Sequence, residues 1–293
     1  LPRTRQLMLL CFLPMIFGIA LLYGYAGSFD LAAIADWARL LPLPGALPKA
    51  AALLVLCGLF LKAAVFPFHG WAPDAYAGAR LPVTALLASP VKAAVVLALV
   101  RIAPAVPLAL DSAAVIGALA IVSIAFGNLA ALAQKTFRRM LAYSSVAHAG
   151  YMIAALLDTT GQRGDDLVWY AAIYALATLI ACACAARLMP NDDDDLSVLD
   201  GAFARRPGVA LLLAAALLSL AGLPPFPGFF AKLMVFRSVI ASGYLVPAVI
   251  AFAASFIGLA YYVGIAMRLF RAGPGRESAA APDAVSDTGG ATA

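Results

Sequence analysis

The sequence predicts an all-α integral membrane protein with about eight transmembrane helices, two of them interrupted by proline. Hydrophobic residues make up 64% of the 293 residues and charged residues only 12%, whereas soluble domains average about 25% charged residues. The mean hydropathy is +0.95, so there is too little polar surface to cover a globule in water. The apolar runs are continuous and rich in alanine and leucine, which excludes the alternating pattern of a membrane β-barrel.

Eight apolar segments are candidates for spans, because a helix needs about 20 apolar residues to cross the hydrocarbon layer. They all belong to one polytopic membrane domain, residues 1–271, and the segment that follows, residues 272–293, is rich in Ala, Gly, Ser, Pro and Asp. We expect this C-terminal tail to be disordered. The expected spans are residues 7–24, 50–69, 83–101, 112–133, 140–157, 167–188, 208–238 and 244–267.

Lysine and arginine predict the orientation of these spans. If the chain starts in the cytoplasm, twelve basic residues fall on the cytoplasmic side and five on the other. This asymmetry agrees with the positive-inside rule and predicts that both ends of the chain are cytoplasmic. It also accounts for the net charge of +5 without nucleic acid as a partner. The acidic run Asp192–Asp195 is expected to be a solvated loop, with contact to a basic partner as the alternative.

Three lysines, Lys62, Lys92 and Lys232, lie within expected spans. A charged lysine at the centre of a lone membrane helix costs about 2.5–3.5 kcal/mol on insertion scales. A buried lysine can give up its proton, whereas arginine stays charged. Together the three predict a hydrated path for protons through the protein interior. For any one of them the alternative is a structural lysine bound to carbonyl or carboxylate groups.

Prolines beside two of these lysines predict broken helices. Pro67 follows Lys62 by five residues, and three prolines between residues 224 and 227 precede Lys232. Proline removes a backbone donor and interrupts a helix, and free backbone at membrane depth is tolerated only inside protein or beside water. Paired interrupted spans indicate an ion path in transporters built from inverted repeats.

The two histidines are further candidates for proton transfer. His148 lies inside an expected span, about one turn after Ser144 and Ser145, and both a proton relay and a packing role are open for it. His69 is expected near the cytoplasmic end of its span, where it would admit protons or cap the broken helix. Asn128 is expected to hydrogen-bond between helices. No pattern for a nucleotide, haem, iron–sulfur or metal site is found in the sequence, so we expect this chain to bind no cofactor.

Three segments resemble the antiporter-like membrane subunits of respiratory complex I. They are FLKAAVFPFHGWAPDAYAGARLPVTALLASPVKAAVVLALVR, NLAALAQKTFRRMLAYSSVAHAGYMIAALL and LLSLAGLPPFPGFFAKLMVF. The resemblance covers roughly residues 5–270. It implies a proton pump built from two inverted five-helix repeats. By this resemblance Lys62 and Lys232 correspond to the lysines of the two broken helices, Lys232 facing the outlet half-channel, and Lys92 to the lysine of the helix after the first break.

The sequence departs from that family at several points. The family's essential glutamate lies on a helix upstream of the first residue here, and the family's final helix is not found. A lysine expected near the start is replaced by Arg3, and Pro90 precedes Lys92 where the family usually lacks proline. We therefore expect an incomplete first repeat, a complete second repeat, and either a fragment or a divergent short form.

The resemblance implies a non-redox, proton-translocating subunit of an NADH–quinone oxidoreductase in the inner membrane of a bacterium. Its partners would be the other membrane subunits and the lipid bilayer, and quinone would be reached only through the complex. Protons would pass through Lys62, Lys92, His148 and Lys232, with His69 near the entry. The alternatives are a subunit of a multi-subunit cation/proton antiporter or membrane-bound hydrogenase, and a purely structural scaffold.

Overall fold

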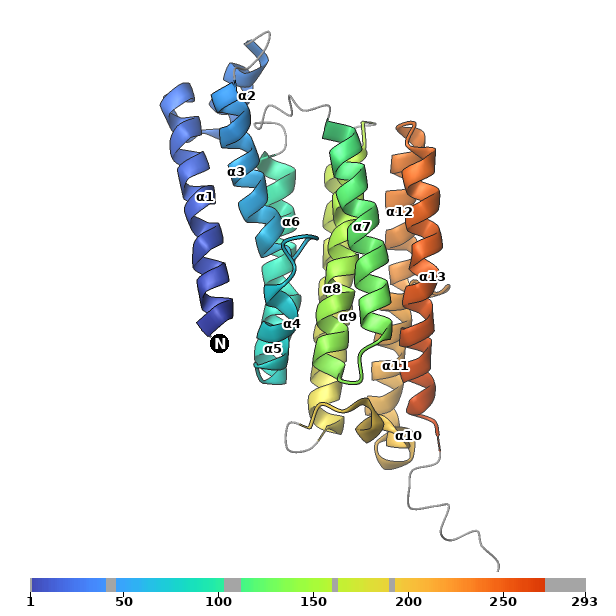
Figure 1. The fold of residues 1–293 in the computed structure, drawn as a ribbon. Helices are drawn as coiled ribbons and strands as arrows, with labels where there is room; N and C mark the ends of the chain where they lie inside the picture. Colours follow the sequence, from blue (N-terminus) through green and yellow to red (C-terminus); the bar gives the residue numbers. More distant parts are fainter. Residues whose placement is uncertain (1, 41–45, 103–111, 160–162, 190–192, 272–293) are drawn as a thin grey trace, which may run out of the picture.

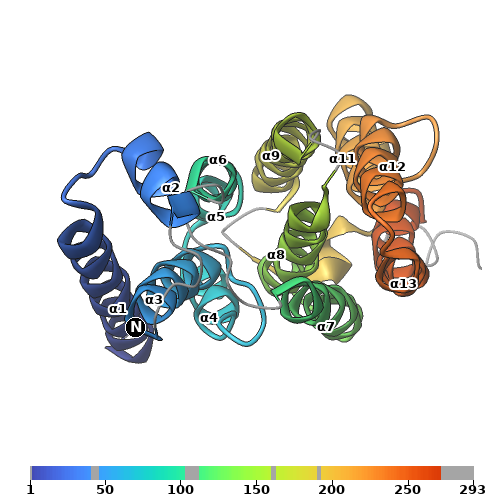
Figure 2. The ribbon, with the colours of Figure 1, turned by 90° about the horizontal axis from the view of Figure 1, so that it is seen from above.

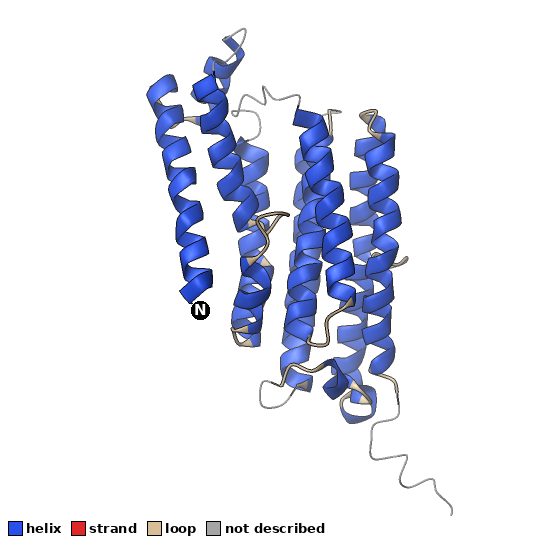
Figure 3. Cartoon of the chain, viewed as in Figure 1, coloured by secondary structure: helices blue, strands red, loops and turns tan. Residues whose placement is uncertain are grey.

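Helices form all the regular secondary structure in the described part of the chain (Figures 1 and 3), apart from one isolated bridge between Thr136 and Asp195. A computed structural model of the protein describes residues 2–40, 46–102, 112–159, 163–189 and 193–271. The predicted all-α class is confirmed. The expected disordered tail, residues 272–293, lies outside the described residues.

Each expected span coincides with one helix or with a pair of consecutive helices. The helices are α1 (Pro2–Ala26), α2 (Leu31–Leu40), α3 (Ala46–Lys62), α4 (Trp71–Ala77), α5 (Leu81–Ala88), α6 (Pro90–Ile102), α7 (Ser112–Leu132), α8 (Phe137–Ala154), α9 (Arg163–Leu188), α10 (Ala202–Arg205), α11 (Pro207–Ala221), α12 (Pro227–Ala241) and α13 (Leu245–Arg268).

Among the described residues, five helical stretches are long and apolar enough to cross a membrane on their own. A sixth is added if the bent pair Phe12–Ala26 and Leu31–Trp37 counts as one span. The expected number of about eight is reached only when the broken pairs α3–α4 and α11–α12 are counted as spans too. Each of these four helices is too short to cross by itself, which is the physical consequence of the predicted breaks.

Helix α8 is the most enclosed of the five long spans. Its apolar window is 94% buried, whereas the other four are 39–50% buried. Figure 2 shows α1–α6 on one side and α7–α13 on the other, with α8 in the middle of the second group. Helix α4 packs against α8, and α5 and α6 pack against α9. The outer helices expose large apolar side chains, as expected for a surface in contact with lipid.

The first predicted break separates α3 from α4, and its backbone groups are bonded by side chains. The Phe66 N–H donates to Ser123 Oγ on α7 at 3.1 Å, and Trp71 Nε1 donates to the Leu61 carbonyl at 2.7 Å. Ala64 takes a left-handed conformation with φ 58°. Unpaired backbone groups are costly at membrane depth, so these contacts make the interruption possible.

The second predicted break separates α11 from α12 and depends on two glycines. Gly222 has φ +82°, and its N–H reaches the carbonyls of Leu218 and Ser219 at 3.1 and 3.0 Å. The Gly228 N–H donates to Ser219 Oγ at 3.1 Å. A Cβ on Gly228 would lie 1.8 Å from the Ser219 carbonyl oxygen. Glycine is therefore required where α12 begins against α11.

A third, milder interruption lies at Ser89, between α5 and α6. Pro90 begins α6 and has no N–H to bond within the helix. The Ser89 hydroxyl donates to the Ala175 carbonyl on α9 at 2.8 Å. Residues 81–102 still form one candidate span, and Lys92 lies in the first turn after the interruption.

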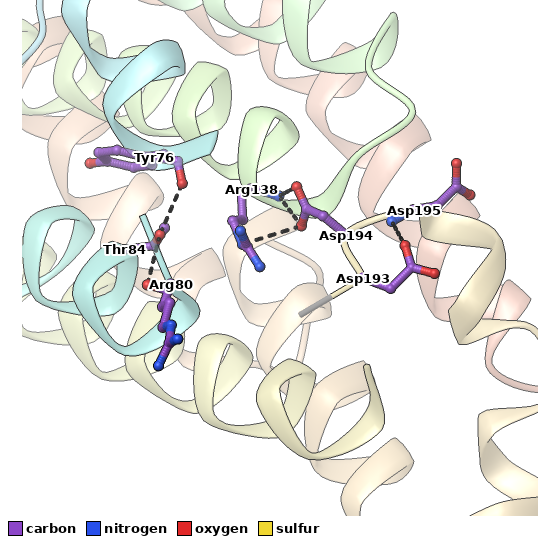
Figure 4. A network of polar contacts seen from close by, with 7 residues as sticks. All are labelled: Tyr76, Arg80, Thr84, Arg138, Asp193, Asp194 and Asp195. Atoms are coloured by element: carbon purple, nitrogen blue, oxygen red, sulfur yellow. Dashed lines mark hydrogen bonds and ion pairs between the residues drawn. The ribbon is translucent and has the colours of Figure 1, made fainter. Parts of the chain in front are cut away.

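The acidic run before α10 packs onto the start of α8 (Figure 4). Asp194 accepts the Arg138 N–H at 3.0 Å and lies 3.6 Å from Arg138 Nε, and the Phe137 N–H donates to the Asp194 carbonyl at 2.9 Å. A carboxylate is stabilised near a helix N-terminus. The expectation of a solvated loop is wrong for Asp194, whose side chain is 17% exposed. Asp192 lies outside the described residues.

Replacing Gly228 with alanine should destabilise the protein, because the added Cβ overlaps the Ser219 carbonyl. We expect a loss of about 1–3 kcal/mol, as in overpacked cores. The matched control is Gly208→Ala, since Gly208 also follows a proline at the start of a helix but its Cβ would meet no atom within 4 Å. Thermal unfolding in detergent measures the difference, and equal midpoints for the two variants would contradict it.

Asp194→Asn should lower stability by about 0.5–1 kcal/mol, because it keeps an acceptor for the Arg138 N–H but removes the charge at the start of α8. Asp193→Asn is the control, since Asp193 is exposed and, among the described residues, accepts a hydrogen bond from the nearby Asp195 N–H. Unfolding midpoints at low and high salt test this. A difference between the two variants that does not shrink with salt would argue against an electrostatic cause.

Candidate proton-transfer site

Lys92 is held by neutral groups in the protein interior. It lies on α6, is 2% exposed, and donates from Nζ to both the carbonyl and the hydroxyl of Ser145 on α8. Its Nζ also lies 5.8 Å from the ring centre of Tyr174 on α9. Aromatic faces attract cations. Among the described residues no acidic side chain forms a salt bridge with this ammonium group.

Lys232 is held in a similar way at the second break. It lies on α12, is 7% exposed, and donates from Nζ to the Ala221 carbonyl at 2.8 Å. Ala221 ends α11, so its carbonyl is one of those that a helix C-terminus leaves free. The ammonium group also lies 4.9 Å from the ring centre of Tyr151. A Cβ on Gly222 would lie 2.8 Å from Lys232 Cδ, so Gly222 also makes room for this side chain.

His148 lies on α8 and is surrounded by hydroxyl groups. It is 4% exposed; its Nδ1 lies 2.9 Å from the Tyr170 hydroxyl and its Nε2 3.4 Å from the Tyr262 hydroxyl. Tyr262 in turn hydrogen-bonds the Ser144 hydroxyl. Each nitrogen of an imidazole can donate or accept according to its protonation. Both ring nitrogens of His148 therefore have a partner suited to proton exchange.

These groups lie one after another in the protein interior. Lys92 bonds Ser145, which precedes His148 by one turn of α8. His148 and Lys232 line the same cavity of about 10 Å³, which is about the space that one water molecule needs. We call the sequence Lys92–Ser145–His148–Lys232 the polar row. The structure thus brings together three of the five residues that the sequence predicted for proton transfer.

Lys62 and His69 lie apart from the polar row. Lys62 ends α3, is half-buried, and places its Nζ 5.0 Å from the ring centre of Phe12 on α1. The His69 ring packs at the first break, 5.3 Å from Phe66 and 4.6 Å from Phe126 between ring centres. No hydrogen bond or ring contact in the described part of the chain joins either residue to Lys92 or His148. Their roles in proton transfer stay predictions.

The tyrosines around the polar row were not predicted from the sequence. Buried tyrosines occur in many cores, so the pattern alone did not single them out. Spacing was an available signal, since Tyr170 and Tyr174 are four apart and share a face of α9. The prediction for Asn128 is confirmed, because it donates to the Ala254 carbonyl at 3.1 Å and accepts from the Tyr261 hydroxyl at 3.2 Å, both on α13.

Comparison with known proteins identifies similar sequences along most of the chain. The family model described as "NADH:quinone oxidoreductase/Mrp antiporter, TM" matches residues 5–258. NADH-quinone oxidoreductase subunit N of Pelobacter propionicus is 50% identical over 257 residues, covering 88% of this chain and 55% of the relative. Subunit 14 of the Thermus thermophilus enzyme is 41% identical, covering 87% of this chain and 55% of the relative. The chain thus spans about half the length of the curated relatives it matches.

Solved structures share the fold. A chain of respiratory complex I from Thermus thermophilus with bound aureothin has a TM-score of 0.79 at 38% identity, covering 92% of this chain and 58% of that chain. A chain of the Mrp complex from Dietzia sp. has a TM-score of 0.74 at 26% identity, covering 92% of this chain and 50% of that chain.

Proposed function

Because the chain belongs to the family of NADH:quinone oxidoreductase and Mrp antiporter transmembrane proteins, we propose that it transfers protons within a bacterial NADH–quinone oxidoreductase, as a component of the subunit N type. The observation that carries this proposal is the polar row, in which two lysines and a histidine are buried without a carboxylate partner among the described residues. The 50% identity to a subunit N supports this type of subunit.

The contacts of the polar row suit a proton that moves in steps. The Ser145 hydroxyl accepts from the Lys92 ammonium group and can donate to the neutral amine, so both forms of Lys92 have a partner. A proton that leaves Lys92 passes to the Ser145 hydroxyl. Water would connect Ser145 to His148, one turn along α8, and a water in the shared cavity would connect His148 to Lys232. Each transfer moves one positive charge from a donor that becomes neutral to an acceptor that becomes charged.

The same proposal implies the membrane, the orientation and the partners of the chain. The chain is a multi-pass membrane protein; we place it in the bacterial inner membrane, with the end of the molecule near α10 and the C-terminus of α13 on the cytoplasmic side. Its partners would be the other membrane subunits of the complex. Reduction of quinone would occur in those subunits, so this chain would bind no redox cofactor. Lys62 would receive protons from a part of the complex outside these residues.

A cation/proton antiporter subunit is the second candidate, because the family description includes Mrp antiporters. The lower identity to the Mrp complex chain, 26% against 38% for the complex I chain, favours the first candidate. Proton movement driven by a sodium gradient without NADH would support the antiporter. NADH-driven proton movement that is independent of sodium would support the oxidoreductase.

Lys92→Arg and Lys232→Arg should each lower NADH-driven proton uptake by inverted membrane vesicles several-fold. Arginine keeps the buried positive charge but does not release its proton. Lys135→Arg, at an exposed position before α8, is the control and should pump as the native chain does. Proton uptake is followed with a pH-sensitive dye, alongside the rate of NADH oxidation and the amount of assembled complex. Native uptake in both interior variants would refute the proposal.

A further inference from the structure

Helix α9 carries a line of buried polar side chains on the face that packs against the protein. Its members, the α9 stripe, recur every four residues and are each buried: Asp166, Tyr170, Tyr174 and Thr178. Residues four apart are neighbours on a helix surface. The side chains of Trp169 and Leu176, between them, are exposed. The stripe begins at the end of the molecule opposite α10 (Figure 1) and reaches the polar row.

The inner part of the α9 stripe contacts the polar row directly. The Tyr174 ring lies under the Lys92 ammonium group, and the Tyr170 hydroxyl bonds His148. Tyr170 and Tyr174 also line the cavity shared by His148 and Lys232. A proton at His148 or Lys232 is therefore already beside the stripe.

The outer part of the α9 stripe ends at a buried carboxylate. Asp166 is 4% exposed and accepts a hydrogen bond from the Ser238 hydroxyl on α12. It lies in the first turn of α9, where the helix N-terminus stabilises negative charge. In the described part of the chain, no lysine or arginine forms a salt bridge with Asp166. The carboxylate can thus accept a proton without breaking an ion pair.

Hydroxyl groups continue from Asp166 towards the surface. The Ser242 hydroxyl lies 2.9 Å from the Ser238 carbonyl and 3.2 Å from Asp158 Oδ1. The Thr159 N–H, at an exposed position, donates to Ser242 Oγ at 2.9 Å. Polar groups therefore extend from the buried carboxylate to the end of the molecule where α9 starts.

We propose that Asp166 is the proton-release group on the non-cytoplasmic side of the protein. The proton leaves His148 by way of the Tyr170 hydroxyl, and a water between Tyr170 and Asp166, one turn apart on α9, would carry it to the carboxylate. His148 then becomes neutral and the Asp166 carboxylate becomes a carboxylic acid. Asp166 then gives the proton to water beside Ser242, and no oxidant or reductant takes part. This inference rests on the proposed function, to which it adds the exit.

The test compares Asp166→Asn with Asp166→Glu in the complete membrane complex. Asparagine keeps an acceptor for Ser238 but cannot carry a proton, whereas glutamate keeps the titratable group. We expect Asp166→Asn to lower NADH-driven proton uptake by inverted vesicles several-fold and Asp166→Glu to restore a large part of it. Asp165→Asn, at an exposed position in the same turn of α9, is the matched control and should behave as the native chain.

Two results would overturn the assignment. One is native proton uptake in Asp166→Asn. The other is equal loss of uptake in Asp166→Asn, Asp166→Glu and Ser238→Ala together with loss of assembled complex, which would make Asp166 an anchor between α9 and α12. Lys92→Arg and Lys232→Arg are measured in parallel, because native uptake in both variants refutes the proposed function itself. Loss in Lys232→Arg with native uptake in Asp166→Asn refutes only the release group.

Discussion

An ammonium group removed from water has to be solvated by the protein itself, and the arrangement around α8 follows from this requirement. The Lys92 ammonium group donates hydrogen bonds to both oxygens of Ser145, and the Lys232 ammonium group donates to the Ala221 carbonyl. That carbonyl is free because α11 ends in the middle of the span, and Gly222 leaves space for the lysine chain to reach it. The buried lysine thus depends on the helix break, because the break frees the carbonyl that binds its ammonium group.

Helix α7 packs closely against one side of α8, and the polar row lies on the other side of α8. A Cβ on Gly127 of α7 would lie 2.5 Å from the Ala147 nitrogen, and one on Gly150 would lie 2.8 Å from the Ala120 carbonyl oxygen. Small residues allow two membrane helices to approach this closely. Ser145 and His148 face away from this contact, towards α6, α9 and α13. A larger residue at either glycine would shift the polar row as a whole.

The sequence predicted the long apolar helices and both breaks, but not the short helices α2, α4 and α10. It also singled out the lysines and the histidine of the polar row, because each interrupts an apolar pattern at a single position. It did not predict which way a side chain points. Lys62 faces Phe12 on α1 rather than α8, and that direction depends on packing between helices. Asp166 follows the exposed Asp165 at the start of a helix, so the sequence around it is typical of a solvent-exposed loop end and does not indicate a buried side chain. Its buried side chain accepts a hydrogen bond from Ser238, 72 residues later in the chain.

In the described part of the chain, charged side chains at the helix ends form ion pairs, whereas the lysines of the polar row form none. Arg138 with Asp194 and Arg268 with Asp200 are ion pairs at 3.6 Å, at the start of α8 and the end of α13. A carboxylate bound to a buried lysine would fix its charge, since breaking such a pair is costly. Carbonyls, hydroxyls and aromatic rings stabilise the ammonium cation less than a carboxylate would, and they also tolerate the neutral amine. Under the proposed function, the charge of the row would change with every proton that enters, and each occupied position would repel the next proton until the previous one had moved on.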